Sequence, residues 1–374
     1  MKIAVIDADL IGRNKHRFPN LACMKISSYH KKLGDEVTLE LSYDNLEDYD
    51  KVYISKVFTD TPIPEGIEKL TWVECGGTGF FFDKAPNLPY DIEHSFPDYH
   101  LYDSFIESKF IYDEESGKIL NRSEFKEYLD YSIGFITRGC FRKCGFCVNK
   151  KYDRVFKHSP LEEFYDPNRK KICLLDDNFL GHADWKAGLE ELIATGKPFK
   201  FKQGLDERLL TPEKCELLFN SKYDSDITFA FDKIEDYRLI EKKLQMIRQY
   251  TERQIVFYVL CGYDDNEKYD EDFWKQDLIN TFERIELLGR YRALPYIMRF
   301  NKYHESPYRG IYITLARWCN QFSFFKKKSF YEYCIVGGKS SIRYFEKLER
   351  DYPEIAERYC YKKYWYDENG GNKC

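Results

Sequence analysis

The chain has 374 residues and a formal net charge of −5, with ordinary hydrophobic content and a high aromatic fraction of 17%. This length is enough for two or three domains with cores of their own. The modest negative charge argues against a protein that coats nucleic acid over its whole surface. No segment approaches eighteen consecutive apolar residues, so we expect no membrane span.

The first twelve residues, MKIAVIDADLIG, have the pattern of a β-strand. They lack the basic region, the long apolar run and the small-residue cleavage site of a signal peptide. Twelve cysteines in a leaderless chain of this size favour reduced thiols and a metal site over disulfides. We therefore expect a cytoplasmic protein.

Residues 1–125 alternate between strand and helix patterns. A helical pattern at residues 20–34 ends at Gly34, and apolar strand patterns lie at residues 2–8, 51–59 and 70–80, the last running into a glycine turn. This alternation predicts an open, Rossmann-like parallel sheet that ends in the polar stretch around residues 113–125. We expect residues 83–110, rich in Asp, Pro and Tyr, to be a connector.

A second alternating series occupies residues 126–300. Its six strand patterns, separated by helical patterns, lie at residues 131–139, 171–177, 199–204, 227–232, 254–263 and 294–300. Six strands are two short of a closed eight-stranded barrel, so we expect a partial (βα)6, TIM-like barrel. In a parallel α/β sheet the active site lies at the carboxyl ends of the strands.

Residues 301–374 differ in composition, and we expect a mainly helical C-terminal region. Between Arg284 and Arg350 there are fourteen Lys or Arg against five Asp or Glu. Aromatic residues are interleaved with these charges, among them Tyr291, Tyr296, Phe300, Tyr303, Tyr308, Trp318, Phe324, Phe325 and Tyr331. Positive charge with stacking surfaces suits single-stranded nucleic acid, whereas excess Lys and Arg also form ordinary solvated surfaces.

The stretch GCFRKCGFC, residues 139–147, places Cys140, Cys144 and Cys147 in a CxxxCxxC spacing on the loop that follows the first strand of the second series. A structural zinc site needs four ligands. The nearest candidates for a fourth are His158 and Cys173, and neither completes a second ligand pair. An iron–sulfur cluster held by three thiolates leaves one iron open to another ligand.

This motif, with the aromatic Phe146 before its last cysteine, resembles the radical S-adenosylmethionine superfamily. The resemblance covers roughly residues 130–300 and implies a 4Fe–4S cluster ligated by Cys140, Cys144 and Cys147. It also implies S-adenosylmethionine at the open iron and an external electron donor of the flavodoxin or ferredoxin type. Reductive cleavage of S-adenosylmethionine would release a 5′-deoxyadenosyl radical that abstracts hydrogen from a substrate.

In that family the carboxyl ends of the later strands hold the methionyl amine, the ribose and the adenine. After the second strand this chain has the acidic pair Asp176 and Asp177 in place of a glycine-rich GGE turn. Either carboxylate is a candidate acceptor for the ammonium group, and the alternative is a helix cap.

The later strand ends supply weaker candidates. Gln203 and Arg208 are candidates for the ribose or the carboxylate, although Arg208 also has a surface ion pair with Asp206 or Glu207 as its alternative. Asp232 follows the fourth strand. Gly262 follows the fifth, where a glycine allows the backbone to approach a flat adenine.

The N-terminal sheet resembles the cobalamin-binding domain of one subgroup of the superfamily. That domain carries DxHxxG after its first strand, and this chain has DADLIG, with Asp9 where the histidine would ligate cobalt. The segment ECGGTGF resembles the later glycine turn of the same domain. Carboxylate is a poor substitute for imidazole on cobalt, so we favour a degenerate domain, with cobalamin binding as the alternative.

Four functions remain open at this point. The first is a radical S-adenosylmethionine enzyme with an unidentified substrate. The alternatives are a cobalamin-dependent radical methyltransferase, an RNA- or DNA-modifying radical enzyme, and a zinc-stabilised binding protein that is not an enzyme.

Overall fold

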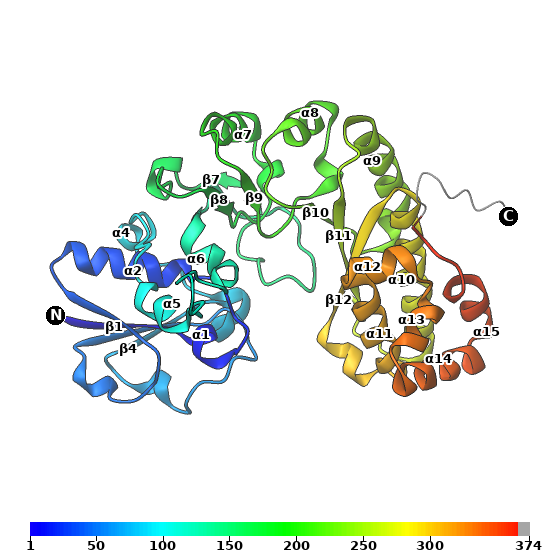
Figure 1. Cartoon of the computed structure of the whole chain (residues 1–374), viewed down its shortest axis with the longest axis horizontal. Coiled ribbons are helices and arrows are strands. Elements are labelled where there is room, and N and C mark those ends of the chain that lie inside the picture. Colours follow the sequence, from blue (N-terminus) through cyan, green and yellow to red (C-terminus); the bar gives the residue numbers. More distant parts are fainter. Residues whose placement is uncertain (366–374) are drawn as a thin grey trace. The chain divides into compact units, whose positions relative to one another are not determined.

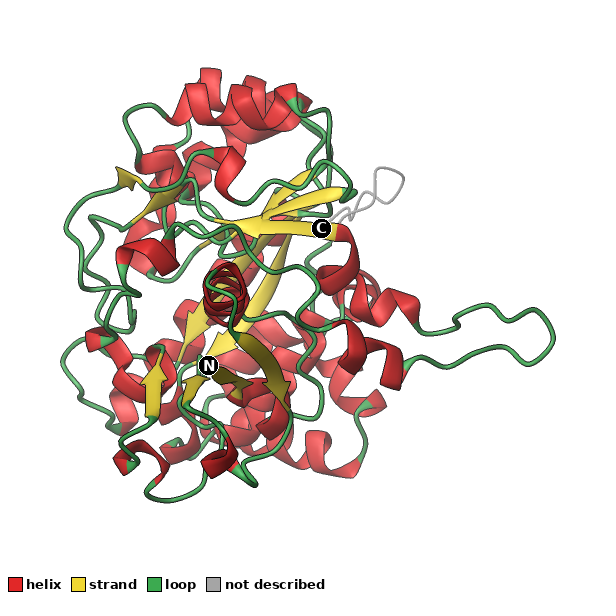
Figure 2. Cartoon of the chain, turned by 90° about the vertical axis from the view of Figure 1, so that its left-hand side faces the viewer, coloured by secondary structure: helices red, strands yellow, loops and turns green. Residues whose placement is uncertain are grey.

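The computed structural model describes residues 1–365, and Figures 1 and 2 show its helices and strands. The chain divides into two compact units. The first unit contains residues 1–182 and 194–202, and the second contains residues 183–193 and the chain from residue 203 onwards. Each unit has parallel strands and helices, so the predicted α/β class is confirmed. The division into domains at residues 125 and 300 stays a prediction.

The first unit begins with a four-stranded parallel sheet. Its strands are β1 (Lys2–Asp7), β2 (Glu36–Glu40), β3 (Lys51–Ser55) and β4 (Val73–Gly76), in the spatial order β2-β1-β3-β4. The strand order therefore reverses direction at β1. In open α/β sheets the crevice at such a reversal, outside the carboxyl ends of the strands, is where ligands bind.

Helix α2 (Leu21–Lys32) covers one face of this sheet. The Asn20 side chain caps it by accepting from the backbone N–H groups of Ala22 and Cys23, which satisfies two donors that a helix start leaves unpaired. The last turn carries Lys31 and Lys32, whose positive charges suit the negative end of the helix dipole.

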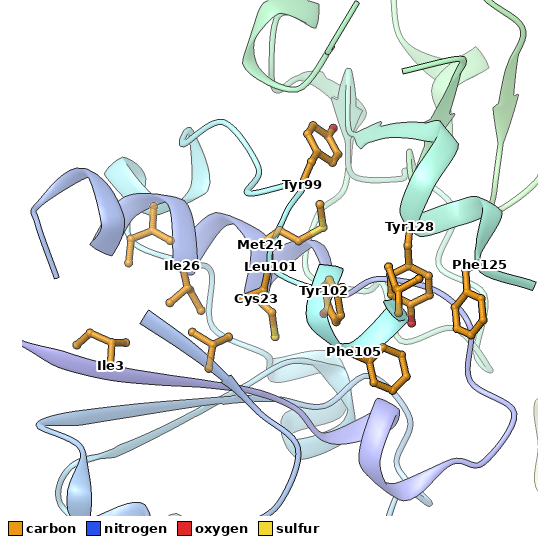
Figure 3. Packing of buried hydrophobic residues seen from close by; sticks show 13 residues of the cluster. Ile3, Cys23, Met24, Ile26, Tyr99, Leu101, Tyr102, Phe105, Phe125 and Tyr128 are labelled. Atoms are coloured by element: carbon orange, nitrogen blue, oxygen red, sulfur yellow. The ribbon is translucent and has the colours of Figure 1, made fainter. Parts of the chain in front are cut away.

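The core under α2 contains residues that lie about a hundred positions apart in the sequence (Figure 3). Cys23 and Met24 of α2 lie among rings that follow the sheet in the chain, including Tyr102, Phe105 and Phe125. In the expected connector, α4 (Tyr90–Glu93) adds Ile92 to this core and α5 (Asp103–Lys109) adds Phe105, with Tyr102 directly before it. Phe125 ends a short 3-10 helix just before α6 (Lys126–Asp130). The connector is thus part of the core of the first unit.

A second parallel sheet completes the first unit. Strands β5 (Tyr131–Gly134), β8 (Lys171–Leu174) and β9 (Phe199–Phe201) pair in that order. A small antiparallel pair, β6 (Thr137–Arg138) with β7 (Phe156–Lys157), follows β5 directly. Helix α7 (Trp185–Ala194) lies between β8 and β9 in the chain.

The second unit contains the remaining strands of the second series. Strands β10 (Ile227–Ala230), β11 (Ile255–Cys261) and β12 (Ala293–Arg299) form a parallel sheet in that order. Helix α8 (Pro212–Asn220) precedes β10, whereas α9 (Tyr237–Tyr250) and α10 (Glu271–Arg290) separate the three strands along the chain. Helix α10 packs on β11 and β12. All six predicted strands therefore form, as two three-stranded parallel sheets. Their arrangement as one partial barrel stays a prediction.

The C-terminal region is helical, as predicted. It consists of α11 (Arg309–Asn320), α12 (Phe322–Lys327), α13 (Phe330–Val336), α14 (Lys339–Asp351) and α15 (Pro353–Ile355). A capping box fixes the start of α13, because the Ser329 hydroxyl accepts from the Glu332 amide while the Glu332 carboxylate accepts from the Ser329 amide. Trp318 is fully buried, within 5.5 Å of the Phe325 and Phe330 rings by their centroids.

Besides the short helices of the connector, two β elements were not predicted from the sequence. Strand β2 reads EVTLE, is half-exposed along most of its length and pairs on one side only with β1. An edge strand of this kind lacks the continuous apolar run of a central parallel strand. The β6–β7 pair has two residues on each side, which is too short to leave a periodic signal.

Phe125 offers a test of the aromatic core of the first unit. Its ring is 1% exposed and lies against Phe105, Phe110 and Tyr128. We expect Phe125→Ala to lower the free energy of unfolding by about 3–5 kcal/mol because it leaves a cavity. We expect Ile111→Ala, at a side chain that is 57% exposed, to change it by less than about 0.5 kcal/mol. Urea denaturation measures both, and equal losses would contradict the assignment of this core.

Candidate functional site

The structure places the predicted site residues in both compact units. The cysteine motif with Phe146, Asp176 and Asp177 belongs to the first unit, and Gln203, Arg208, Asp232 and Gly262 belong to the second.

The cysteine loop, residues 139–155, runs between the paired strands β6 and β7. It begins at Gly139, whose φ of +88° is a left-handed conformation that side chains disfavour. A Cβ at this position would also lie 2.3 Å from the Arg154 carbonyl oxygen. Glycine is therefore required for the two ends of the loop to approach one another just before Cys140.

Asp176, immediately beyond β8, anchors the strand that leads into the loop. Its side chain is buried and accepts from the Ile136 amide at 3.2 Å, the Thr137 amide at 2.6 Å and the Thr137 hydroxyl at 2.7 Å. Burial raises the pKa of Asp176 to about 7, although these hydrogen bonds favour its charged form. Its observed partners belong to the chain, and its role as an acceptor for a cofactor ammonium stays a prediction.

The next two residues hold the start of the loop itself. Asp177 accepts from the Gly139 amide at 2.6 Å, and the Asn178 side-chain amide donates to the Cys140 sulfur at 3.4 Å. The sequence offered a helix cap as the alternative role of Asp176 and Asp177. Both carboxylates instead accept from backbone amides in and around β6. The turn after β8, Asp176 to Asn178, thus holds three residues at the start of the cysteine loop: Thr137, Gly139 and Cys140.

Two cysteine sulfurs of the loop also receive backbone N–H groups. The Arg142 amide donates to the Cys140 sulfur and the Asn149 amide to the Cys147 sulfur, each at 3.3 Å. Burial raises the pKa of the Cys147 thiol, while the Asn149 amide opposes that shift. Donors aimed at sulfur favour negative charge on it, and thiolates are the form in which cysteine binds metals.

The loop carries three cysteines, the residue type that ligates iron–sulfur clusters. As the side chains stand, no three His, Cys, Asp or Glu residues among residues 1–365 are close enough together to hold one metal ion. Asn178 Oδ1, next to the loop, is a buried acceptor without a donor in the described chain. Buried polar atoms of this kind usually bind an ion, a water or a ligand.

The two candidates for a fourth zinc ligand are engaged elsewhere. The Nδ1 atom of His158 lies 3.0 Å from the Ser159 hydroxyl, and its Nε2 atom lies 3.3 Å from the Glu93 carboxylate. Cys173 is fully buried in β8 and packs with Tyr131 and Ile133. Neither side chain extends the cysteine motif.

Glu93 links the loop to the N-terminal sheet through a charge cluster inside the first unit. Its carboxylate lies 3.2 Å from the Lys25 ammonium and 3.7 Å from the Arg138 guanidinium, in addition to its contact with His158. Burial would raise the pKa of Glu93, but these positive groups outweigh it and lower the pKa to about 2. Helix α2, which carries Lys25, and strand β6, which carries Arg138, therefore share one anion.

The remaining surface of the loop is basic. Lysine ammonium groups there donate to uncharged oxygens: Lys143 to the carbonyls of Lys150 and Tyr152, Lys150 to that of Gly145, and Lys151 to the Asn87 side chain. Elsewhere lysines often pair with carboxylates, as Lys200 does with Glu127. Lys143, Lys150 and Lys151 therefore place their positive charges beside uncharged oxygens.

The N-terminal sheet uses Asp9, the residue at the predicted cobalt-ligand position, for a different purpose. Asp9 is fully buried and accepts from the Val57 amide at 2.6 Å, the Phe58 amide and the Thr61 hydroxyl. At the glycine turn after β4, a Cβ on Gly77 would lie 2.3 Å from the Lys56 carbonyl oxygen. Asp9 and the glycine turn, the two features that resemble a cobalamin domain, therefore both contact the segment that follows β3.

In the second unit, Arg208 forms ion pairs with neighbouring carboxylates, the alternative to binding a cofactor that the sequence offered. Its Nε lies 2.7 Å from Asp206 and its NH1 lies 3.1 Å from Asp236. Gln203 is exposed. The neighbouring Glu207 is buried and accepts from the Ala230 amide at the end of β10, and burial raises its pKa to about 8.

Asp232 and Gly262 lie at strand ends that two buried residues of α10 hold together. The Arg284 guanidinium donates to the carbonyls of Phe231, Asp232 and Leu260. The Asp277 carboxylate accepts from the Gly262 amide at 2.9 Å and from the Tyr312 hydroxyl. Neither Asp277 nor Arg284 was predicted from the sequence. Both are charged residues within the apolar pattern of α10, which is the signal of a charge on the buried face of a helix.

The aromatic residues of the C-terminal region mainly build its core. Trp318 and Phe325 are fully buried and Tyr303 and Tyr308 nearly so, whereas Tyr296 is 39% exposed. Several of its basic residues form ion pairs, among them Arg290 with Glu241 and Lys347 with Asp351. Four of the aromatics named from the sequence are therefore core residues, and a nucleic-acid partner stays a prediction.

No protein-family model and no curated protein matches the chain. One solved structure, the cobalamin-dependent S-adenosylmethionine radical enzyme OxsB with aqua-cobalamin and S-adenosylmethionine bound, aligns with 96% of this chain at 14% identity and a TM-score of 0.34. The chain spans 56% of the length of that protein. A TM-score of this size defines neither a shared fold nor a shared function.

Within residues 1–365, none of the helices combines the length and the apolar character that crossing a bilayer demands.

The Asp176 contacts predict the behaviour of the loop in the metal-free protein. Asp176→Ala removes the acceptor of two amides and a hydroxyl, and each buried donor left unpaired costs about 1–3 kcal/mol. We expect the Thr137 amide to exchange with deuterium at least about tenfold faster, since 1.4 kcal/mol corresponds to a factor of ten. We expect no change for Asp153→Ala, an exposed acid on the same loop. Unchanged Thr137 protection in Asp176→Ala would refute the anchoring role.

Proposed function

We propose that the chain is a radical S-adenosylmethionine enzyme. The observation that supports this most is the CxxxCxxC loop beyond the first strand of a parallel sheet, with hydrogen-bond donors aimed at the sulfurs of Cys140 and Cys147. Cys140, Cys144 and Cys147 would hold a 4Fe–4S cluster. When bound, that cluster supplies the electron that cleaves S-adenosylmethionine reductively to give a 5′-deoxyadenosyl radical.

In this proposal the chain itself positions and shields the site. Asp176 and Asp177 fix the strand and the glycine that precede Cys140. Fixed donors around a metal site lower the cost of reorganisation when charge changes. Phe146 and the residues of the later strand ends are proposed to contact S-adenosylmethionine. The substrate that loses hydrogen is not identified by any of these residues.

We propose that the N-terminal sheet binds no cobalamin. Asp9 accepts three hydrogen bonds from the turn after β3, so its carboxylate serves that turn. We therefore propose a degenerate domain that supports the cysteine loop through the Lys25–Glu93 contact. A cobalamin-dependent methyltransferase is accordingly the less favoured function.

Cluster assembly and turnover test the proposal directly. Protein reconstituted anaerobically with iron and sulfide should be brown, and the reduced protein should convert S-adenosylmethionine to 5′-deoxyadenosine. Cys144→Ala should lose the colour and the product, because a required thiolate is gone. Cys75→Ala, at a half-buried cysteine of β4 outside the loop, should keep both. A colourless wild-type protein with one zinc per chain would instead support the zinc-stabilised binding protein.

The basic loop supports an acidic electron donor of the flavodoxin or ferredoxin type. Complementary charge raises association rates by about ten- to a thousandfold at low salt. We expect a Lys151→Glu, Arg154→Glu variant to slow 5′-deoxyadenosine formation about tenfold with reduced flavodoxin. With dithionite, which needs no docking surface, the rate should not change.

A charge reversal far along the chain provides the control for this experiment. Lys339→Glu with Arg343→Glu, on α14, should leave both rates at the wild-type level. If the loop variant slowed the reaction with dithionite as much as with flavodoxin, the loop would not be a docking surface.

A further inference from the structure

Asn178, in the Asp176–Asn178 turn, contacts a cysteine sulfur of the loop. Its Nδ2 atom donates to Cys140 Sγ at 3.4 Å, and the side chain is 3% exposed. No feature of the sequence marked this residue, because an asparagine after two acidic residues is common in turns.

The Asn178 amide lies in a closely packed part of the first unit. Gly181, three residues further along the chain, leaves room for the Phe141 ring, since a Cβ there would lie 2.8 Å from that ring. Phe141 follows Cys140 directly in the chain. The turn after β8 therefore packs against the start of the cysteine loop, where Asn178 donates to the Cys140 sulfur.

We propose that Asn178 sets the reduction potential of the cluster through its hydrogen bond to the Cys140 sulfur. This inference rests on the proposed function, since it requires a cluster at the cysteines. The residue acts through Cys140, so it is a positioning residue and not a catalytic one.

The direction of the effect follows from charge. A reduced cluster carries one more electron than an oxidised one, and part of that charge resides on the cysteine sulfurs. An N–H donor stabilises the more negative state, so it raises the reduction potential. Burial strengthens the effect, because a hydrogen bond is electrostatically stronger at low dielectric than in water.

Asn178 differs from the other donors to these sulfurs in being replaceable by mutation. The Arg142 and Asn149 donors are backbone amides, which persist whatever side chain is present. Asn149 therefore supplies a matched control: Asn149→Leu changes a side chain at the same loop and retains the bond to Cys147.

Redox titration followed by electron paramagnetic resonance of the reconstituted holoprotein tests the proposal. We expect Asn178→Leu to shift the midpoint potential in the negative direction. We expect Asn178→Asp, which preserves volume but replaces the donor with a carboxylate, to shift it further. Asn149→Leu should keep the wild-type potential. A purely structural role for Asn178 would change the amount of cluster bound, and not the potential of the clusters that remain.

A second measurement needs no variant and covers the case in which substitution prevents cluster assembly. Wild-type holoprotein carrying asparagine labelled with ¹⁵N in the side-chain amide should show a weak ¹⁵N coupling to the reduced cluster in pulsed electron paramagnetic resonance. The label excludes the backbone donors, including the Asn149 amide. Absence of the coupling would overturn the assignment.

The two possible failures give different results. Wild-type protein that assembles no iron–sulfur cluster would refute the proposed function and this inference together. A wild-type cluster whose potential is the same in Asn178→Leu and Asn178→Asp, or shifts equally in Asn149→Leu, would refute the role of Asn178 alone.

Discussion

The cysteine loop depends on one buried carboxylate. Asp176 accepts from two amides and a hydroxyl on the segment that leads into the loop, and it does so where water is excluded. An isolated buried charge is strongly unfavourable, so the Asp176 side chain and its donors must fold together. Gly139 and Cys140 then have defined positions, because Asp177 and Asn178 follow in the same turn.

The same arrangement recurs at other strand ends of the chain. Asp9 accepts from amides after β3, Asp277 accepts from the Gly262 amide after β11, and Glu207 accepts from the Ala230 amide at the end of β10. In each case an acidic side chain satisfies backbone donors that a parallel strand leaves unpaired where it ends. Asp277 and Glu207 are both buried, and this burial raises the pKa of each carboxyl group.

The sequence was informative wherever one apolar run or one spacing carried the signal. Each central strand follows a continuous apolar segment, and the cysteine motif lies on the loop where the strand pattern placed it. The role of Asp176 was not predictable, because its partners lie forty residues away and an acidic turn suits a cap, a cofactor contact or an anchor equally. Arg284 is visible as a charge within the apolar pattern of α10, but its carbonyl partners were not predictable, since they follow or belong to two separate strands.

The close contact at Gly139 has a consequence for recognising distant relatives. Its φ of +88° and the nearby Arg154 carbonyl exclude every other residue type from that position, and the neighbouring turn needs oxygen acceptors and one amide in fixed succession. A search pattern that joins Thr-x-Gly-Cys-x3-Cys-x2-Cys to a downstream Asp-Asp-Asn would therefore encode backbone geometry as well as metal chemistry. Such a pattern separates chains that build this loop from those in which three cysteines share the spacing by chance.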